Sequence, residues 1–151
     1  MKARLSLSHC LAAALVVPSL AFASLGGNIA SIQADQVQMK ATSRIASTQA
    51  KYTVHEIQTT SGTAVREYVA ANGTVFGVAW NGPVVPNLRQ VLGQYFVPFT
   101  QAAKTLQSGH SHLLIQQANL VVRASGHMRA FRGNAYVPSM LPQGVTTNEI
   151  L

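Results

Sequence analysis

The dipeptide Asn72-Gly73, which lies between two runs of alternating apolar residues, constrains this fold more than any other feature of the sequence. Residues 63–70 and 74–80 are rich in β-branched and aromatic residues, as β-strands are. Asn-Gly is a strong hairpin signal because a type I′ turn needs positive φ at both central residues. We therefore expect an antiparallel hairpin with Asn72 and Gly73 at its tip.

A two-residue loop would also set the register of this hairpin. It places Val69 opposite Phe76, Glu67 opposite Val78, and Val65 opposite Trp80. Alternation then puts five apolar side chains on one face, which we expect to be the core: Val65, Val69, Phe76, Val78 and Trp80. Glu67 falls on the same face and does not fit the apolar pattern.

The segment after the hairpin has the spacing of an amphipathic helix. Its apolar residues form one wide stripe: Leu88, Val91, Leu92, Tyr95, Phe96 and Phe99. Asn87, with Gln90 three residues later, resembles a capping box. Pro98 should end or kink the helix near Val97, and residues 102–106 would continue it as a second piece. We expect this helix to cover one face of the sheet.

Shorter strand-like runs follow this helix. Leu113–Gln116 and Leu120–Ala124 have strand composition, and Ser125-Gly126 is typical of a turn that leads into a returning strand at His127–Arg132. Gly133-Asn134 indicates one more turn before residues 135–137.

Two further segments complete the expected fold. Tyr52–Ile57 has strand composition, and residues 138–144 contain two prolines and a glycine, which indicates an irregular tail. The sequence therefore predicts an α+β domain, in which an antiparallel β-meander packs against one main amphipathic helix.

The N-terminus has the three parts of a secretory signal. Lys2 and Arg4 precede an apolar stretch at residues 5–20, and Ala21-Phe22-Ala23 supplies the small residues that a signal peptidase reads. We expect cleavage after Ala23 and export to the periplasm or the outside. The alternative is a retained membrane anchor, but the apolar stretch is short for a span and polar residues interrupt it.

Cleavage would leave 128 residues without cysteine, so the mature domain has neither disulfides nor thiol chemistry. We expect residues 24–50 to form a polar arm or a short helix, and residues 51–151 to form the α+β domain. A helix is expected near residues 31–41, with Ser31 as its N-cap.

The charge of the mature chain argues against nucleic acid. Nine basic and four acidic residues give a net charge of +5, which reflects scarce acids, and the bases are scattered along the sequence. Without a lysine- or arginine-rich run, no phosphate track is expected. We expect no transmembrane segment after cleavage, and an envelope component or a small anionic ligand as partner.

Several motifs together resemble a bacterial family catalogued as domain of unknown function 2844, which occurs in exported proteins. The resemblance rests on Tyr52–Ile57, Arg66–Val69, Val78–Trp80 with Gly82-Pro83, Leu92–Phe96, Gly126–Phe131 and Ala135–Pro138. It covers essentially the whole mature chain from Leu25. It implies export and a single domain, and it carries no activity, cofactor or catalytic residue.

Histidines and arginines supply the candidate site residues. His110 and His112 have the spacing that places two imidazoles on one face of a strand, and His127 is a candidate third metal ligand. Solvent-exposed loop histidines are the plainer interpretation.

An anion site is the second hypothesis, with Arg129, His127 and Arg123 as its residues. The expected turn at Ser125-Gly126 would put Arg129 opposite Val122. The alternative is a structural strand arginine that pairs with a carbonyl or with Glu67.

Catalytic motifs are scarce in the sequence. It contains no Gly-x-Ser-x-Gly elbow, no carboxylate pair spaced for glycoside chemistry and no phosphate-binding glycine loop. We therefore expect a non-enzymatic envelope binding or interaction module without a cofactor. The alternative is a small metal-assisted or acid–base enzyme that uses the histidines.

Overall fold

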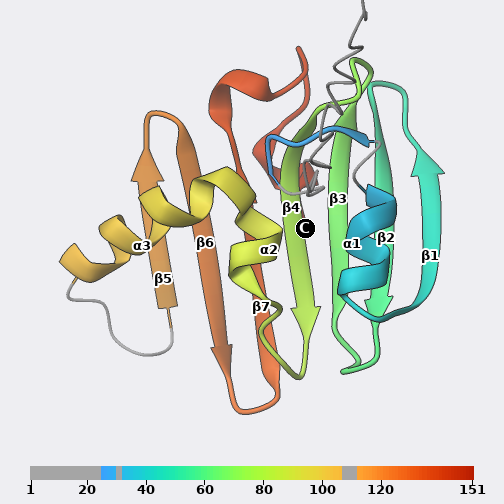
Figure 1. The fold of residues 1–151 in the computed structure, drawn as a ribbon. Helices are drawn as coiled ribbons and strands as arrows, with labels where there is room; N and C mark the ends of the chain where they lie inside the picture. Colours follow the sequence, from blue (N-terminus) through green and yellow to red (C-terminus); the bar gives the residue numbers. More distant parts are fainter. Residues whose placement is uncertain (1–24, 30–31, 107–111) are drawn as a thin grey trace, which may run out of the picture.

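A single seven-stranded antiparallel sheet forms the centre of the protein, in a computed structural model that describes residues 25–29, 32–106 and 112–151 (Figure 1). The elements are α1 (Ile32–Gln38), β1 (Ala41–Thr48), β2 (Tyr52–Thr59), β3 (Ala64–Ala70), β4 (Val75–Gly82), α2 (Leu88–Leu92), η2 (Gly93–Tyr95), α3 (Phe96–Thr105), β5 (His112–Gln117), β6 (Leu120–His127), β7 (Ala130–Tyr136), η3 (Pro138–Met140) and η4 (Thr147–Glu149). The α+β class expected from the sequence is confirmed.

The strand order is β1-β2-β3-β4-β7-β6-β5. Strands β1 to β4 form one meander, and α2 and α3 then carry the chain across the sheet to the opposite edge at β5 (Figure 1). Strands β5 to β7 form a second meander that runs back, so that β7 pairs with β4 at the centre. The last strand of the chain, β7, therefore lies inside the sheet, and the two edges are β1 and β5.

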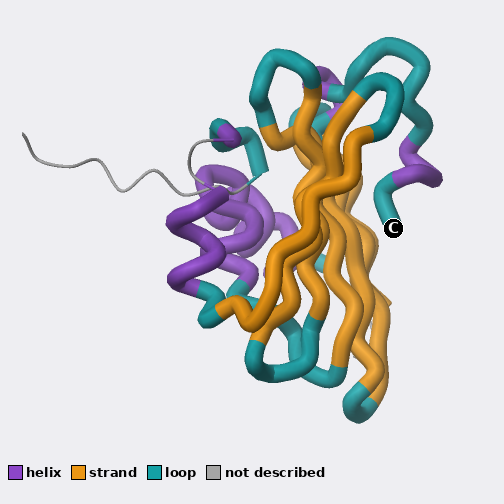
Figure 2. The backbone as a smooth tube through the Cα atoms, turned by 90° about the vertical axis from the view of Figure 1, so that its right-hand side faces the viewer, coloured by secondary structure: helices purple, strands orange, loops and turns teal. Residues whose placement is uncertain are grey.

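The two faces of the sheet are covered by different parts of the chain. Figure 2 shows the main helices on one side and the C-terminus on the other. The helix side holds the larger core, which includes Val65, Val78, Trp80, Leu92, Val122 and Ala135. The opposite side holds a smaller core under the C-terminal tail, residues 138–151, and includes Tyr68, Phe76, Val121, Tyr136 and Ile150.

The helical segment matches its expected apolar stripe, and its break lies earlier than expected. The side chain of Asn87 caps α2 by accepting a hydrogen bond from the N–H of Arg89 at 3.1 Å. The break comes at η2, which begins at Gly93 with φ of +51°, whereas we expected it near Val97. Pro98 lies in the first turn of α3, where its missing N–H costs no hydrogen bond. No helix in the described ranges is long and apolar enough to cross a membrane.

The hairpin of β3 and β4 forms as expected, but its turn and the register beside it differ. The N–H of Ala70 bonds the carbonyl of Thr74, which makes a three-residue loop, and Gly73 alone in it has positive φ, +82°. This is a type I turn with a glycine bulge, and the expected type I′ turn is wrong. Val69 consequently faces Val75, where we had expected Phe76.

A register shift after Val69 restores the expected pairing further along the hairpin, with Glu67 opposite Val78 and Val65 opposite Trp80. Phe76 is the extra residue, and its side chain belongs to the smaller core on the other face. Four of the five expected core residues of this face are therefore correct, and Phe76 is not.

Gly126 and Gly133 were expected to mark turns, and both lie inside strands instead. A Cβ atom at Gly126 would come within 2.6 Å of the ring of Phe131, and one at Gly133 would collide with the ring of Trp80. These glycines therefore allow an aromatic side chain to lie against the backbone. The real turn is at Met128 and Arg129, so β7 runs unbroken through residues expected to be two strands.

The polar segment at residues 24–50 contains α1 and also β1, a strand that was not expected. Strand β1 pairs along its whole length with β2 at the edge of the sheet. Most of its side chains are exposed on both faces, so it lacks the apolar alternation by which strands are recognised. Before α1, Leu25 is wholly buried in the helix-side core, and its N–H bonds the carbonyl of Val91.

Candidate functional site

The sheet face opposite the helices carries two neighbouring rows of side chains that cross six strands from β2 to β5. The first row is Glu56, Arg66, Ala79, Asn134, Arg123 and Leu114. The second is Gln58, Ala64, Asn81, Arg132, Ser125 and His112. The rows are assembled by strand pairing from residues that are far apart in the sequence.

A hollow of about 800 Å³ lies over these rows, and we call it the arginine groove. Its basic side chains are Arg66, His112, Arg123 and Arg132, and its polar ones are Asn81, Ser125 and Asn134. The described residues that line it include no Asp or Glu. The groove therefore presents positive charge together with amide and hydroxyl groups.

Arg123 and Arg132 are the most distinctive pair in the groove. On the paired strands β6 and β7, Arg123 lies opposite Asn134 and Arg132 lies opposite Ser125. The two arginines are therefore diagonal neighbours, about 7–8 Å apart. Both side chains are exposed, and within the described part of the chain neither makes a hydrogen bond or ion pair. Like charges destabilise a sheet when they are directly opposite, so the repulsion between these diagonal, exposed arginines is small, and both guanidinium groups are available to an anion.

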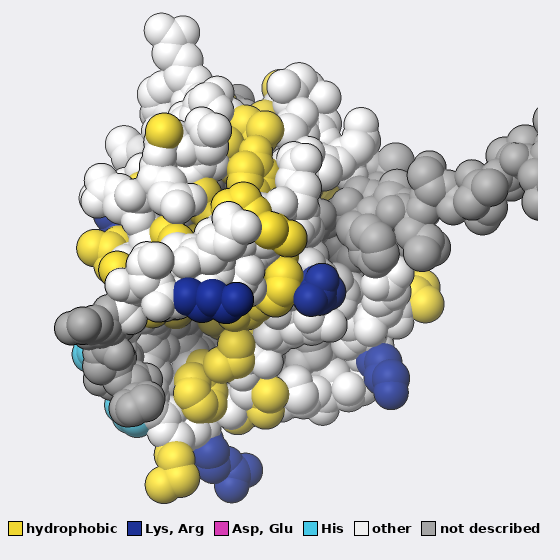
Figure 3. Space-filling view, turned by 60° about the vertical axis from the view of Figure 1, so that its left-hand side comes forward, with side chains coloured by type: hydrophobic (Ala, Val, Ile, Leu, Met, Phe, Trp, Pro, Cys, Tyr) yellow, Lys and Arg dark blue, Asp and Glu magenta, His cyan; other side chains and the backbone are white. Residues whose placement is uncertain are grey.

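The basic side chains on another face of the protein do not gather in this way. Figure 3 views the molecule from the side of α3 and β5, where lysine and arginine side chains stand apart among hydrophobic and uncharged groups. Arg89 is one example, because its guanidinium lies 4.5 Å from the centre of the Phe96 ring and so has a partner within the fold.

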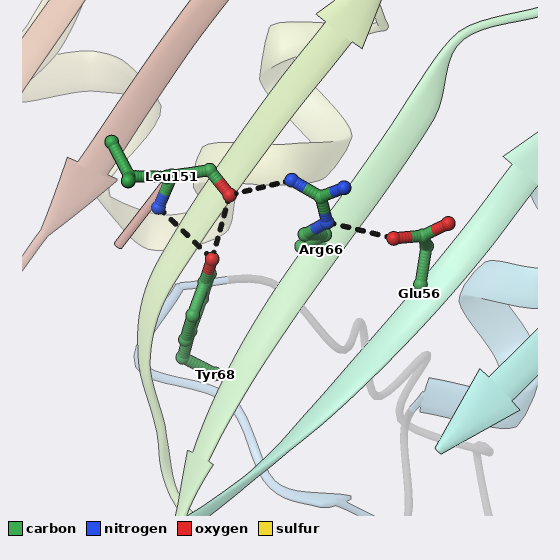
Figure 4. A network of polar contacts seen from close by, with 4 residues as sticks. All are labelled: Glu56, Arg66, Tyr68 and Leu151. Carbon is green, nitrogen blue, oxygen red and sulfur yellow. Dashed lines mark hydrogen bonds and ion pairs between the residues drawn. The ribbon is translucent and has the colours of Figure 1, made fainter. Parts of the chain in front are cut away.

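Arg66 differs from the other groove arginines because the fold already occupies its guanidinium (Figure 4). Its Nε donates to Glu56 at 2.7 Å, and one terminal nitrogen donates to the main-chain oxygen of Leu151 at 2.8 Å. The hydroxyl of Tyr68 donates to the same oxygen at 2.7 Å and accepts from the Leu151 N–H at 3.0 Å. Arg66 and Tyr68 therefore fix the end of the C-terminal tail on the sheet.

The environment of Tyr68 keeps its hydroxyl protonated. Burial raises the pKa of Tyr68, and the contact with Leu151 and the charge of Arg66 only partly oppose this. The neutral hydroxyl can therefore donate to Leu151 at any pH near neutrality.

A second hollow of about 430 Å³ lies on the other side of the Arg66–Leu151 contact, and we call it the tyrosine hollow. It is lined by Tyr52, Tyr68, Glu56 and Glu149, and Arg66 and Leu151 line both hollows. The hydroxyl of Tyr52 donates to Glu149 at 3.0 Å. The two hollows therefore adjoin but differ in charge.

Hydrogen bonds set the charge state of Glu149. The Thr146 N–H, and after it the Tyr52 hydroxyl, lower the pKa of this carboxyl. Partial burial, followed by the hydrogen bond and charge of Glu149, raises the pKa of Tyr52. The pair is therefore a carboxylate held by a neutral phenol.

A separate polar cluster is buried on the helix side of the sheet. His55 and Glu67 are opposite each other on β2 and β3, and both are almost wholly buried. A terminal nitrogen of Arg44 lies 2.9 Å from Nδ1 of His55 and donates to it when the ring is neutral. Burial, and then the charge of Arg44, lower the pKa of His55, so the neutral ring is favoured. No hollow described above reaches this cluster.

Comparison with protein families gives one match, which covers nearly the whole chain. The family described as protein of unknown function DUF2844 matches residues 21–150. The chain belongs to this family. The resemblance expected from the sequence motifs is thereby confirmed. Comparisons with curated proteins and with solved structures give no match.

The structure of this DUF2844 chain brings some of the residues expected at an anion site together and separates others. Arg123 lies in the arginine groove. Arg129 lies in the β6–β7 turn with φ of +62°, and His127 ends β6, so both are at the tip of the hairpin. The expected pairing of Arg129 with Val122 is wrong, because Val122 faces Ala135.

The histidines expected at a metal site are only partly placed. His112 lines the arginine groove and lies opposite Ser125 of β6. His127 is on the same face of the sheet, two residues after Ser125. His110 lies outside the described residues. Within the ranges that are described, no three His, Cys, Asp or Glu side chains are grouped to hold a metal ion. The metal site stays a prediction.

Sequence reasoning did not select Arg66, Arg132 or Asn81 as site residues. The expected turn at Ser125-Gly126 gave the wrong register between the two strands, so Arg132 was not expected to lie beside Arg123. With the turn at Met128-Arg129, Arg132 falls beside Arg123 on one face. Arg66 was within reach of sequence reasoning, since alternation along β3 already puts it on the face opposite Val65.

Proposed function

We propose that this DUF2844 chain is an exported, non-enzymatic binding module that holds an anionic ligand in the arginine groove. The observation that carries the proposal is the pair Arg123 and Arg132, which lies beside a hollow whose described lining includes no Asp or Glu. Among the described residues neither arginine side chain has a partner in the fold, and an anion between them would make two charge-assisted contacts.

Arginine is also the right residue type for this role. A guanidinium presents a planar set of donors that matches a carboxylate or phosphate with two parallel hydrogen bonds. Because Arg66 is already bonded to Glu56 and Leu151, it supplies positive potential at one end of the groove, while Arg123 and Arg132 supply free donors.

Binding is favoured over catalysis by the composition of the groove. His112 is the only histidine in the described lining of the groove, and that lining includes no Asp or Glu that could orient its ring. The sequence also lacks the common hydrolytic motifs. His112 is diagonal to Arg123 across β5 and β6, a position from which its ring can hydrogen-bond an anion held by that arginine.

The proposal of export rests on the basic, apolar and small-residue parts of residues 1–23. Its test is to express the full chain in a bacterium and determine the mass and N-terminus of the protein recovered from the envelope. A chain that begins at Ser24 supports export with cleavage, and a cell-associated chain that keeps Met1 contradicts it.

Anion binding is tested on that recovered protein by titration with citrate, inorganic phosphate and an oligogalacturonate at low salt, followed by amide NMR shifts. We expect at least one probe to shift the amides of β6 and β7, with an affinity that falls as salt rises. The double variant Arg123→Gln/Arg132→Gln should lose this binding. Lys104→Gln, which removes a charge from the exposed surface of α3, is the control and should bind normally. Equal binding by the double variant would refute the proposal.

A further inference from the structure

We infer that the ligand of the arginine groove is an extended acidic oligosaccharide, and this inference rests on the proposed anion-binding function. Three properties of the groove point to this class. They are its length across the sheet, the separation of its charges, and the uncharged polar groups between them.

The groove is long compared with a single anion. Its lining runs from Arg66 on β3 across β4, β7 and β6 to His112 and Leu114 on β5. Four strand spacings separate β3 from β5, which is about 19 Å at roughly 4.8 Å per strand. A phosphate, a sulfate or a single sugar acid would occupy only a fraction of this length.

The positive charges are spread along that length. Arg66 and Arg123 are in the same row and three strands apart, which is about 14 Å between their backbones. Arg132 lies between them in the next row. Because the guanidinium of Arg66 is already bonded within the fold, Arg132 and Arg123 supply the free donors, and Arg66 adds positive potential further along the groove for an extended acidic chain.

Groups that are polar but uncharged lie among the arginines. Asn81 pairs with Arg132 across β4 and β7, and Ser125 pairs with it across β7 and β6. An amide and a hydroxyl both donate and accept hydrogen bonds, which suits the hydroxyl groups of a sugar. A linear polyphosphate at neutral pH offers almost only acceptors and would leave the acceptor atoms of Asn81 and Ser125 unused.

Two other classes of extended anion fit less well. Single-stranded nucleic acid binds by stacking bases on exposed aromatic rings. The aromatic residue in the described lining is Trp80, which is only 4% exposed. A lipid needs a continuous apolar surface, but the exposed leucines Leu114 and Leu151 lie at different ends of the groove.

The test uses four probes on the protein recovered after full-chain expression, by calorimetry at low salt. They are tetragalacturonate, monomeric galacturonate, linear tetraphosphate, and maltotetraose as a neutral chain of the same number of sugars. We expect tetragalacturonate to bind at least about tenfold tighter than the monomer, because its linked charges engage separate arginines. Maltotetraose should not bind detectably.

Each other outcome has a defined meaning. If the monomer binds as tightly as the tetramer, or if tetraphosphate binds more tightly, the oligosaccharide inference fails and the anion-binding function stands. A single-stranded oligonucleotide and anionic vesicles are then titrated as competing classes, and tighter binding of either than of tetragalacturonate would overturn the inference in the same way. If no anion binds, the proposed function itself fails.

A variant pair separates sugar recognition from simple charge attraction. Asn81→Ala should weaken tetragalacturonate binding and leave tetraphosphate binding unchanged, because it removes hydroxyl partners without altering charge. Gln101→Ala, which removes an exposed amide from α3, is the matched control and should change neither. Equal weakening of both ligands by Asn81→Ala would overturn the role given to the uncharged groups.

Discussion

The C-terminal tail and the arginine groove occupy the same face of the sheet, and the side chains beneath them differ in kind. Where the tail lies, the strands present Tyr68, Phe76, Val121 and Tyr136, all buried. Beyond its end, β6 and β7 present Arg123 and Arg132, which face solvent. We call these regions the covered half and the open half of this face.

The change occurs within single strands, over very short distances. On β6, Val121 is buried under the tail and Arg123, two residues further, is exposed in the groove. On β7, Tyr136 is buried and Arg132, four residues earlier, is exposed. The reach of the tail therefore decides which residues act as core and which remain available to a ligand. The covered half should contribute stability, and the open half should contribute binding.

Phe76→Ala should have the largest effect on stability. Phe76 is wholly buried in the covered half and packs edge-on against Tyr52, with ring centres 5.8 Å apart. Truncation of a buried phenylalanine costs about 3–5 kcal/mol of unfolding free energy. Urea denaturation measures this loss, and Val97→Ala on the exposed surface of α3 is the control, with a change within about 0.5 kcal/mol. A loss below about 1 kcal/mol would contradict the covered half as a core.

Tyr68→Phe should have an intermediate effect, because it keeps the ring and removes only the hydroxyl that holds Leu151. Since water can replace these bonds at the chain end, we expect a loss of about 1 kcal/mol in unfolding free energy. Protease cleavage of the tail should accelerate in this variant more than in Thr100→Ala, which removes a hydroxyl from α3. Unchanged cleavage would show that the Tyr68 hydroxyl is not needed to hold the tail, which would then depend on contacts such as Arg66 with Leu151 and the burial of Ile150.

The hold on the tail should also weaken at acid pH. The folded pKa of Glu149 lies below its unfolded value near 4.5, so its contribution to stability is complete above pH 4.5 and is lost as pH falls through the folded value. Glu149→Gln should therefore narrow the stability difference between pH 5 and pH 3, measured by thermal unfolding. If stability depends on pH in the same way in Glu149→Gln and in the unaltered protein, the contacts of the Glu149 carboxylate with Tyr52 and Thr146 contribute nothing to folding.

Sequence periodicity was a sufficient guide wherever one face of an element is buried. The apolar stripe from Leu88 to Phe99 and the alternation around Val65 both have one buried face, and both were correctly assigned. Strand β1 has little buried surface on either face, so its sequence has no apolar alternation that would predict a strand.

Glycine was the weakest signal, because it allows a tight turn and a close contact equally well. Gly126 and Gly133 were taken for turns, although they make room for Phe131 and Trp80 within strands. Local sequence does not distinguish these cases, because the aromatic ring over Gly133 comes from β4, about fifty residues earlier in the chain.

The wrong turn positions affected the prediction of the site most, because moving a turn changes which residues are neighbours across the strands. Arg123 was identified as a candidate from the sequence, but its neighbour Arg132 follows only from the correct hairpin. The basic residues are scattered along the sequence, and the strand order β3-β4-β7-β6 gathers three of them on one face. Scattered charge in a sequence of short antiparallel strands is therefore compatible with one cationic groove.

Replacement of Arg123 and Arg132 by glutamine should have the smallest effect on the unfolding free energy. Whether this free energy rises or falls shows whether the arginines serve the fold. Because the two cations repel each other and have no partner in the described structure, the double variant should be more stable by about 0.5 kcal/mol or less at low salt. The gain should shrink at high salt, where the repulsion is screened. Lys104→Gln should show neither the gain nor its salt dependence. A clear loss of stability in the double variant would mean that the arginines serve the fold, and the open half would then be part of the scaffold.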